Sequence, residues 1–180
     1  YGAHPTPHVK GVEAATGALG HGLCFGVGEA LSARTKGKNW LTYVITGDGE
    51  CQEGSNWEAA MAISKFHLTN LIWIIDRNKW QAGGKVSEVM DLEPFADKLK
   101  AFGFDVKDID GHDYDQLIET LKIDRNNLPS KPVAVIANTH KGKGVPFIED
   151  KKEWHSKIPS NDEFAIIIEQ LGLTKEEFEA

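Results

Sequence analysis

Two apolar segments of the chain are each followed by polar residues of types that could bind a metal. Residues 40–46 are rich in aromatic and β-branched residues, which is typical of a buried strand, and a Gly-Asp-Gly turn follows at residues 47–49. Residues 71–75 form a second apolar segment, and Asn78 follows it, thirty positions after Asp48. A helical pattern separates the two segments. The sequence therefore predicts one carboxylate and one amide just past the carboxyl ends of two strands that a helix connects.

These residue types suit Mg²⁺ and a diphosphate. Open α/β sheets bind ligands in the crevice beyond the carboxyl ends of their strands. Mg²⁺ prefers oxygen ligands, usually one or two carboxylates, and leaves its other positions to water and phosphate. Gly47 and Gly49 lack a Cβ, so the backbone there could approach a diphosphate closely. Asp48 and Asn78 are therefore candidate ligands of a metal diphosphate; the alternative is an ordinary turn and a strand-end asparagine.

The longer pattern resembles a known signature. A Gly-Asp-Gly followed by about thirty residues and an asparagine is similar to the thiamine diphosphate signature. Residues 47–54 read Gly-Asp-Gly-Glu-Cys-Gln-Glu-Gly, and residues 57–60 read Trp-Glu-Ala-Ala. Together they resemble the transketolase family, and more narrowly the separate amino-terminal subunit of a two-gene transketolase. The resemblance runs from about residue 2 to residue 159, nearly the whole chain.

Residue by residue, the resemblance implies a metal site and a cofactor site. Mg²⁺, or Ca²⁺ or Mn²⁺ in its place, would be held by Asp48, Asn78 and the backbone carbonyl of Trp80. A smaller aliphatic residue is common in the family at the position of Trp80. Thiamine diphosphate would be bound by Gly17, Leu19, Gly47, Asp48, Gly49, Glu50, Asn78 and His155. Of these, Gly17 and Leu19 match family positions beside the aminopyrimidine.

The resemblance also implies three catalytic residues. His4 lies before a proline in a stretch similar to the family's, where the histidine contacts the sugar. His155 ends a Glu-Trp-His triplet that resembles the late active-site histidine motif, near the diphosphate and the substrate. Glu53 matches a residue at the contact between the two cofactor sites of the dimer. The chain departs from the pattern by Ala3, inserted before His4, and by His21, where a glutamine is usual.

The implied function is one half of a thiamine-dependent transketolase, which transfers a two-carbon ketol unit from a ketose to an aldose. The cofactor carries the chemistry, and the protein supplies position and electrostatics. The family also needs a pyrimidine-binding domain, so a pyrimidine-binding partner subunit is expected, in a heterotetramer or a homodimer of pairs. The expected substrates are small sugars or sugar phosphates. Transketolases carry two more active-site histidines in a preceding segment, so the chain is expected to be truncated at its amino end.

Three other functions stay open on the sequence alone. The chain could serve a 2-oxoacid decarboxylating complex, although the run at residues 50–54 and the Glu-Trp-His triplet favour transketolase. It could belong to a two-component acyloin synthase, because these motifs do not reveal acceptor specificity. It could also be a non-catalytic binding or assembly subunit.

Strands alternate with helices along the chain, which indicates an α/β fold with a doubly wound, mainly parallel sheet and helices on both faces. In the resemblance this is the thiamine diphosphate-binding fold. Two further strands are predicted at residues 104–109 and 132–138. Helices are predicted at residues 19–34, from 55, at 93–102, 115–123 and 161–171, and a short one from 174. Ser55 and Glu58 have the form of a capping box. All of these elements are expected in one domain, residues 1–180.

Three features allow two interpretations each. The helix at residues 19–34 is crowded with glycine and alanine, which favours close packing against either its own sheet or another subunit. Residues 139–146 carry lysines among glycines and form either an anion site or a solvated loop. Cys51 is either a reactive thiol near a helix start or a quiet packed one.

Composition argues against several partners and locations. The 180 residues carry a net charge of −7, which disfavours nucleic acid or an anionic membrane surface as the main partner. No apolar run approaches the ~20 residues needed to span a bilayer, so no membrane partner is expected. With two cysteines and no signal-peptide pattern, the expected location is the cytoplasm.

Overall fold

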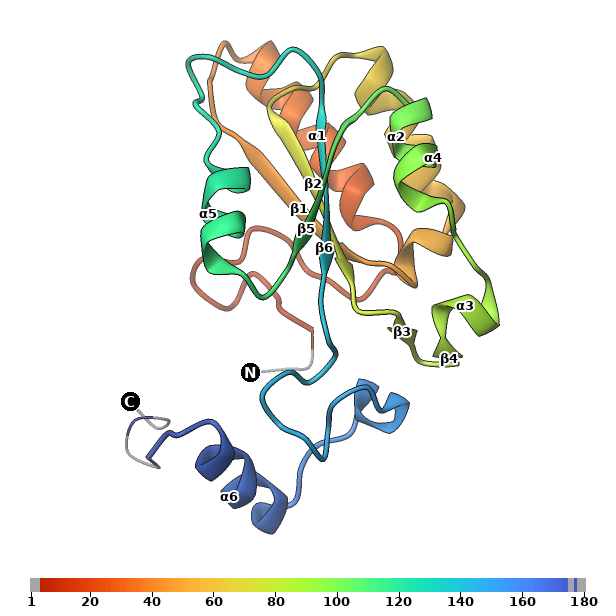
Figure 1. Ribbon diagram of the computed structural model, residues 1–180. Helices are drawn as coiled ribbons and strands as arrows, with labels where there is room; N and C mark the ends of the chain where they lie inside the picture. The colour runs from red at the N-terminus through yellow and green to blue at the C-terminus, as the bar shows by residue number, and fades with distance from the viewer. Residues whose placement is uncertain (1–3, 175–176, 178–180) are drawn as a thin grey trace.

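A computed structural model describes residues 4–174 and 177, built around a four-stranded parallel sheet (Figure 1). The strands are β1 (Thr42–Gly47), β2 (Leu71–Arg77), β5 (Asp105–Asp110) and β6 (Val133–Asn138). Their order across the sheet is β1-β2-β6-β5. The register pairs Gly47 with Asp76 and Arg77 with Asn138, so the strands end at one common edge. This parallel arrangement confirms the predicted sheet.

Helices lie on both faces of the sheet, as the alternation of elements predicted. One face carries α1 (Gly22–Thr35), α2 (Gly54–Lys65) and α4 (Phe95–Ala101), and the other carries α5 (Tyr114–Leu121) (Figure 1). A short helix, η1 (Glu50–Gln52), links β1 to α2. The fold is therefore α/β and doubly wound.

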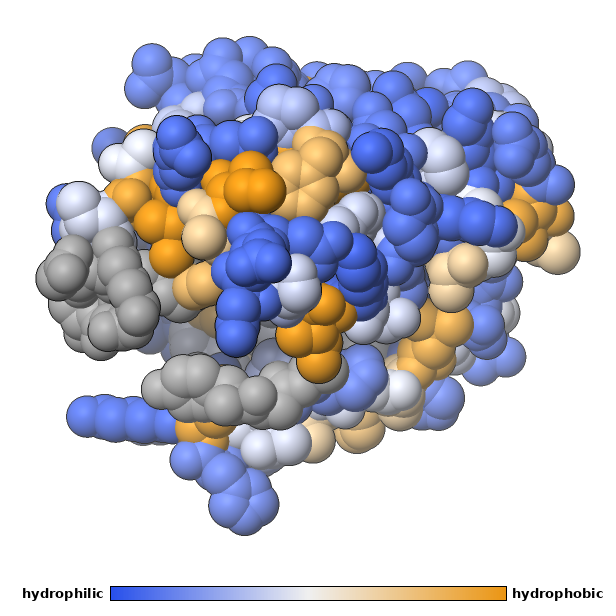
Figure 2. All heavy atoms as spheres, turned by 90° about the horizontal axis from the view of Figure 1, so that it is seen from below, coloured by the Kyte–Doolittle hydropathy of each residue, from blue (hydrophilic) through white to orange (hydrophobic). Residues whose placement is uncertain are grey.

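Smaller elements gather beyond the carboxyl ends of the strands (Figure 1). After β2, the chain forms a hairpin of β3 (Trp80–Gln81) and β4 (Gly84–Lys85), followed by α3 (Val86–Val89). After β6 come η2 (Lys152–His155) and α6 (Asn161–Gln170). Seen from this side, the surface is mainly hydrophilic, with separate hydrophobic patches (Figure 2).

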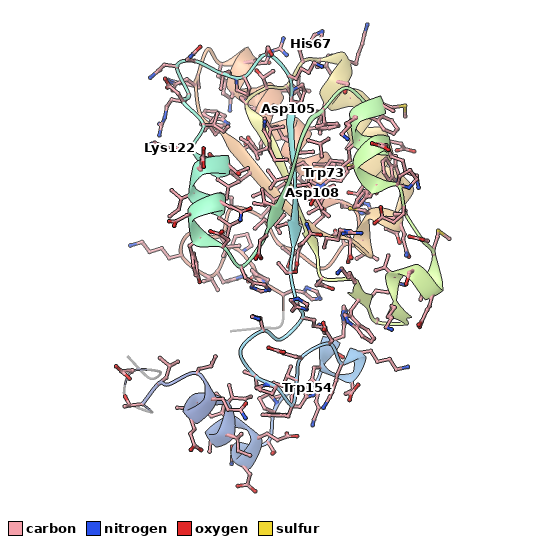
Figure 3. The ribbon with its side chains drawn as sticks, in the orientation of Figure 1. His67, Trp73, Asp105, Asp108, Lys122 and Trp154 are labelled. Carbon is pink, nitrogen blue, oxygen red and sulfur yellow. The ribbon has the colours of Figure 1, made fainter. Side chains whose placement is uncertain are left out.

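The main core lies between the sheet and helices α1, α2 and α4. Trp73 on β2 is fully buried there (Figure 3), and its ring meets those of Trp57 and Phe104 edge to face, with centroids 6.5 and 5.8 Å apart. Its Nε1–H donates to Thr46 Oγ1 at 2.8 Å, so the buried indole is satisfied. Burying large apolar side chains contributes ~1.5–3 kcal/mol each. This packing fixes β1 and β2 side by side, and the polar residues that follow them are held together as a result.

The opposite face of the sheet is only partly covered. Ile72, Val133 and Val135 are buried on that side, with Leu121 of α5 packed against them. Along β1, Tyr43 and Ile45 alternate with the buried Val44, so they point to this second face. Their exposed fractions are 45% and 70%, respectively. Among the described residues, α5 reaches β1 only at Tyr43, whose hydroxyl donates to Leu121 O at 3.1 Å, and Ile45 stays exposed on this face.

The glycine-rich helix α1 packs against its own sheet. A Cβ added to Gly26 would lie 2.3 Å from Val44 Cγ2, which leaves no room for a side chain. Leu23, Ala30 and Ala33 are fully buried on the same helix. By contrast, a Cβ on Gly28 would meet nothing within 4 Å. The predicted close packing of this helix against its own sheet is therefore observed. The face that carries Gly28 stays exposed.

Several predicted local details were wrong. Ser55 and Glu58 do not form a capping box: Glu53 is the N-cap residue of α2 and makes no side-chain cap, and Ser55 Oγ donates to Gly20 O at 2.8 Å. A capping box joins Ser160 and Glu163 instead, at the start of α6. Helix α4 is shorter than predicted and begins at Phe95, after Pro94. The short helix predicted from residue 174 falls largely on residues 175, 176 and 178–180, which lie outside the described residues.

No helix in the part of the chain that the structure describes combines the length and apolar character that crossing a membrane requires.

Candidate functional site

The structure brings Asp48, Asn78 and Trp80 together in the wall of one cavity. Asp48 follows β1 directly, Asn78 follows β2, and these two strands are neighbours in the sheet. The cavity has a volume of about 510 Å³. It is also lined by Arg77, Lys79, Lys85, Val86, Ser87, Asp91, Glu93, Thr139, His140 and Asp150. The strand ends, the β3–β4 hairpin and the segment after β6 thus share one hollow.

Asp48 is a buried carboxylate with backbone partners. The residue is only 4% exposed, its Oδ1 accepts from the Gly49 N–H at 2.9 Å, and its Oδ2 accepts from the Lys79 N–H at 2.8 Å. Burial raises the pKa of this carboxyl, and the two backbone hydrogen bonds oppose the rise. Among the described residues, no cationic side chain forms an ion pair with it. A buried, unpaired carboxylate is costly, and a bound cation would offset that cost.

Asn78 is held by two hydrogen bonds of opposite direction. Its Oδ1 accepts from the Trp80 N–H at 2.9 Å, and its Nδ2 donates to Asp76 Oδ2 at 3.1 Å. Between Asn78 and Trp80, Lys79 adopts a left-handed backbone conformation with φ of 68°, uncommon for a residue with a side chain. The amide of this turned residue is the one that reaches Asp48. The tight turn therefore ties both candidate ligands to the hairpin.

The oxygens at this edge fit Mg²⁺. The side-chain candidates are a carboxylate and an amide oxygen, and the backbone carbonyl of Trp80 would add a third oxygen. No cluster of three or more His, Cys, Asp or Glu side chains that could hold a metal ion occurs within the described ranges. A cation beside Asp48 would thus draw the rest of its ligands from amide, carbonyl, water and phosphate oxygens, as Mg²⁺ commonly does.

The glycines and Glu50 have structural partners of their own. Glu50 Oε1 accepts from the Gly20 N–H at 2.9 Å, and Oε2 accepts from the Gly47 N–H at 3.1 Å. The Glu50 carboxylate therefore joins the turn before α1 to the end of β1, and it does not line the cavity. A Cβ on Gly49 would lie 2.7 Å from Gln81 Cβ, so the close approach observed there is that of the hairpin.

His4 and Gly17 lie against each other, and neither they nor Leu19 and Glu53 line the cavity. A Cβ on Gly17 would lie 3.3 Å from His4 Cδ2, and His4 Nδ1 is 3.5 Å from Thr16 Oγ1. Leu19 is 58% exposed. Glu53 is exposed at the start of α2, where its Cβ and Cγ crowd Gly20. The structure thus pairs His4 with Gly17 and leaves this group open to solvent.

His155 is exposed at the end of η2 and does not line the cavity. The histidine that does is His140, whose Nδ1 lies 3.4 Å from Asp150 Oδ2. The site residues predicted from the sequence include neither His140 nor Asp150, although His140 lies in the stretch at residues 139–146 that could form an anion site. A second cavity of about 500 Å³ shares Lys79, Thr139 and His140 with the first.

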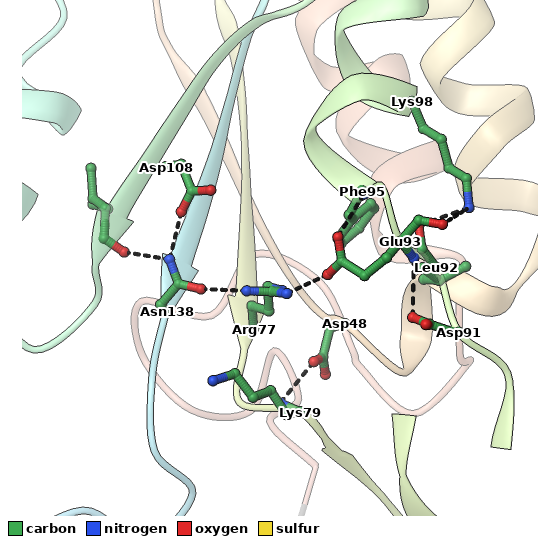
Figure 4. A network of polar contacts seen from close by, with 11 residues as sticks. Asp48, Arg77, Lys79, Asp91, Leu92, Glu93, Phe95, Lys98, Asp108 and Asn138 are labelled. Carbon is green, nitrogen blue, oxygen red and sulfur yellow. Dashed lines mark hydrogen bonds and ion pairs between the residues drawn. The ribbon is translucent and has the colours of Figure 1, made fainter. Parts of the chain in front are cut away.

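A polar network borders the cavity on the β2 side (Figure 4). Arg77 Nη1 donates to Asn138 Oδ1 at 2.8 Å, and Arg77 Nη2 forms an ion pair with Glu93. The Phe95 N–H donates to the Glu93 carboxylate at 2.9 Å, and this bond, together with Arg77, lowers the pKa of Glu93. Arg77 is therefore already engaged by the protein, although it lines the cavity.

Of the two interpretations of Cys51, a reactive thiol or an unreactive packed one, the structure supports the second. It is fully buried, and burial raises its pKa to about 12. A thiol with so high a pKa carries almost no thiolate at neutral pH.

The fold and this edge are typical of α/β domains that bind a ligand beyond the carboxyl ends of a parallel sheet. Comparison with known proteins narrows the class. Residues 2–180 match the family described as "Transketolase, thiamine diphosphate binding domain". The chain therefore belongs to the transketolase family, as its motifs predicted.

Individual relatives agree with this assignment. The chain is 46% identical over 169 residues to an apulose-4-phosphate transketolase subunit of Actinobacillus succinogenes, covering 93% of this chain and 60% of the relative. It is 43% identical over 177 residues to the correspondingly named protein of Phocaeicola vulgatus, covering 98% and 62%. The crystal structure of the Campylobacter jejuni transketolase matches with a TM-score of 0.85 and 32% identity, over 94% of this chain and 28% of that one. The chain thus spans about three fifths of these two curated relatives.

Proposed function

We propose that this chain supplies the diphosphate- and metal-binding half of a thiamine diphosphate-dependent transketolase, which moves a two-carbon ketol unit from a ketose to an aldose. The observation that carries the proposal is the buried carboxylate of Asp48, unpaired by any described cation, beside Asn78 and Trp80 at one sheet edge. The family assignment and the relatives' names as transketolase subunits support it.

Asp48, Asn78 and the Trp80 carbonyl would hold Mg²⁺ and through it the cofactor's diphosphate. When bound, thiamine diphosphate supplies the nucleophilic carbon for the two-carbon transfer, and the protein supplies position and electrostatics. The Gly49 and Lys79 amides keep the carboxylate of Asp48 in place by donating to its two oxygens.

The exposed candidates act on the substrate and the neighbouring subunit. His4 and His155 orient the ketose and stabilise its developing charge. Gly17 and Leu19 lie beside the aminopyrimidine of the cofactor. Glu53 belongs to the contact between two cofactor sites. The exposure of His4, Leu19 and His155 agrees with a site that another subunit covers.

The proposed partner is a pyrimidine-binding transketolase subunit, in a hetero-oligomer located in the cytoplasm. Two relatives are named as subunits of an apulose-4-phosphate transketolase. A third, from Clostridium sp. and 40% identical over 146 residues, is named as a 6-deoxy-6-sulfo-D-fructose transketolase subunit. The sugars in these names carry a phosphate or a sulfonate, so the proposed substrates are small sugars with an anionic group.

The test is reconstitution with a candidate pyrimidine-binding subunit. Titration with thiamine diphosphate by calorimetry, with and without Mg²⁺, measures binding, and a screen of ketose and aldose pairs measures transfer. The Asp48→Ala variant is expected to lose most of its Mg²⁺-dependent affinity. Asp105→Ala is the control, because Asp105 begins β5 at the opposite edge and forms only a surface ion pair with Lys107. Unchanged affinity in Asp48→Ala contradicts the proposed metal site.

A further inference from the structure

Asp76 links the two strand ends that carry the candidate metal ligands. It lies in β2 opposite Gly47, and its backbone carbonyl accepts from the Asp48 N–H at 3.1 Å. Its carboxylate turns to the other ligand: Oδ2 accepts from Asn78 Nδ2 at 3.1 Å. One residue thus contacts Asp48 through its main chain and Asn78 through its side chain. No part of the resemblance assigns it a role.

The hydrogen bonds around Asn78 permit one orientation of its amide. An ionised carboxylate only accepts hydrogen bonds, and a backbone N–H only donates. Because Asp76 faces one end of the amide and the Trp80 N–H faces the other, Nδ2 must point to Asp76 and Oδ1 to Trp80. A flipped amide would set two donors against each other and two acceptors against each other. The oxygen end, which is the only end able to bind a cation, is therefore fixed.

The second carboxylate oxygen of Asp76 anchors the segment that follows β6. Thr139 Oγ1 donates to Asp76 Oδ1, and Thr139 lines both cavities. The Thr139 N–H also donates to Arg77 O at 3.3 Å, next to Asp76 in the chain. The half-buried carboxylate is therefore held from two sides, which keeps it from rotating away from Asn78.

We propose that Asp76 is a positioning residue for the metal site: it holds the amide of Asn78 with its oxygen available to the cation that carries the diphosphate. This inference rests on the proposed function. Outer-shell partners of this kind orient metal ligands, and their removal typically costs about 10- to 100-fold in metal affinity or activity.

Three variants separate positioning from charge. Asp76→Ala removes both contacts and is expected to weaken Mg²⁺-dependent binding of thiamine diphosphate about 10-fold or more in the reconstituted complex. Asp76→Asn keeps an oxygen for Asn78 and an amide that can donate to Thr139, so it is expected to retain most of the affinity. Asp108→Ala is the matched control, because Asp108 likewise accepts from an asparagine amide, that of Asn138 on β6.

A second readout needs neither cofactor nor partner. In the free chain, the two side-chain amide protons of Asn78 can be followed by ¹⁵N-resolved NMR. The Nδ2 proton that Asn78 donates to Asp76 is expected downfield and slow to exchange with solvent, a signature that Asp76→Ala loses and Asp76→Asn keeps. Assignment of the resonance follows from its disappearance in Asn78→Asp.

The outcomes discriminate. Unchanged affinity and unchanged Asn78 resonances in Asp76→Ala overturn the proposal. An Asp76→Asn variant as weak as Asp76→Ala also overturns it, because negative charge rather than orientation would then matter. If Asp76→Ala does not fold, the Mg²⁺-dependent cofactor affinity of Asp76→Asn decides alone: retained affinity supports the proposal, and lost affinity overturns it. If Asp48→Ala keeps full affinity, the proposed metal site itself fails, whereas the NMR result still reports whether Asp76 holds Asn78.

Discussion

The backbone N–H of Lys79 donates to Asp48 Oδ2 at 2.8 Å and so joins the turn after β2 to the turn after β1. The bond forms because Lys79 takes a left-handed conformation directly after Asn78. It sets a buried carboxylate and an amide side by side before any ligand arrives. Such preorganisation lowers the cost of ordering the site on binding.

The first prediction concerns pH and Asp48. Burial raises the folded-state pKa of Asp48 above its ordinary value of 3.8. A raised pKa means that the folded state binds the proton more tightly than the unfolded state. The contribution of Asp48 to stability is therefore fully present below about pH 4, near the unfolded pKa, and is lost as pH rises through the folded pKa.

The measurement compares metal-free wild type with Asp48→Asn by chemical unfolding from pH 7 downward. The difference in unfolding free energy should shift in favour of wild type as pH falls, because only wild type gains from protonation at this site. Saturating Mg²⁺ and thiamine diphosphate should reduce the shift, since a cation favours the ionised carboxylate. A difference that is flat with pH contradicts the raised pKa.

The second prediction concerns Gly49. Gly49→Ala should destabilise the protein by about 1–3 kcal/mol, because the new Cβ would collide with Gln81 and push the hairpin away from the strand ends. Mg²⁺-dependent cofactor binding should weaken with it, because the hairpin carries Trp80. Gly54→Ala is the control: a Cβ there meets nothing within 4 Å, at the start of α2. Equal behaviour of the two variants in unfolding experiments would show that the Gly49 contact is unimportant.

The third prediction contrasts two glycines of α1. Gly26→Ala should be destabilising, since its Cβ would lie 2.3 Å from Val44 Cγ2. Gly28→Ala should stabilise the isolated chain by about 0.5–1 kcal/mol, because alanine is the better helix former and the space is open. Thermal unfolding of both variants checks the signs. Gly28→Ala that stabilises the free chain but weakens assembly would place the partner on this face of the helix.

The fourth prediction concerns His155. Because its side chain is exposed at the end of η2, His155→Ala should leave the melting temperature nearly unchanged. In the reconstituted complex it should lower turnover or raise the substrate requirement. His67→Asn is a suitable control: His67 lies at the far end of the sheet (Figure 3), with φ of 48°, a conformation that asparagine tolerates. Loss of folded protein with full activity per folded molecule would make His155 structural.

The fifth prediction is that the chain alone does not transfer two-carbon units. The cavity beside Asp48 is open, and a half-covered site leaves developing charge in water, where electrostatic stabilisation is weak. Purified chain with thiamine diphosphate, Mg²⁺ and a ketose–aldose pair should show no turnover until a pyrimidine-binding subunit is added. Robust turnover by the isolated chain would refute the division of the site between subunits.

Much of this protein could be predicted from its sequence because the signals are local. The apolar runs that became β1 and β2 show β-branched and aromatic patterns, and the Gly-Asp-Gly turn and Asn78 stand directly at their ends. Parallel strands joined by helices end at one edge of the sheet, so alternation places Asp48 and Asn78 at that edge. They meet there because β1 and β2 are also neighbours in the sheet. Ser55 shows the limit of local signals: its hydroxyl bonds to Gly20, thirty-five positions away, instead of capping its own helix.

Only the tertiary structure decided which residues complete the cavity and what orients the candidate metal ligands. His140, Asp150 and Glu93 reach the cavity beside Asp48 from distant parts of the chain, through loops with no periodic pattern. The hydrogen bond that Asn78 donates to Asp76 spans two positions, yet whether it forms depends on the β2 backbone and on Thr139, sixty-three residues away from Asp76. Sequence spacing determines which groups arrive at a sheet edge, because the point at which a strand ends depends on residues close by in the sequence. The direction in which each group points depends on contacts between segments, which form only when the chain has folded.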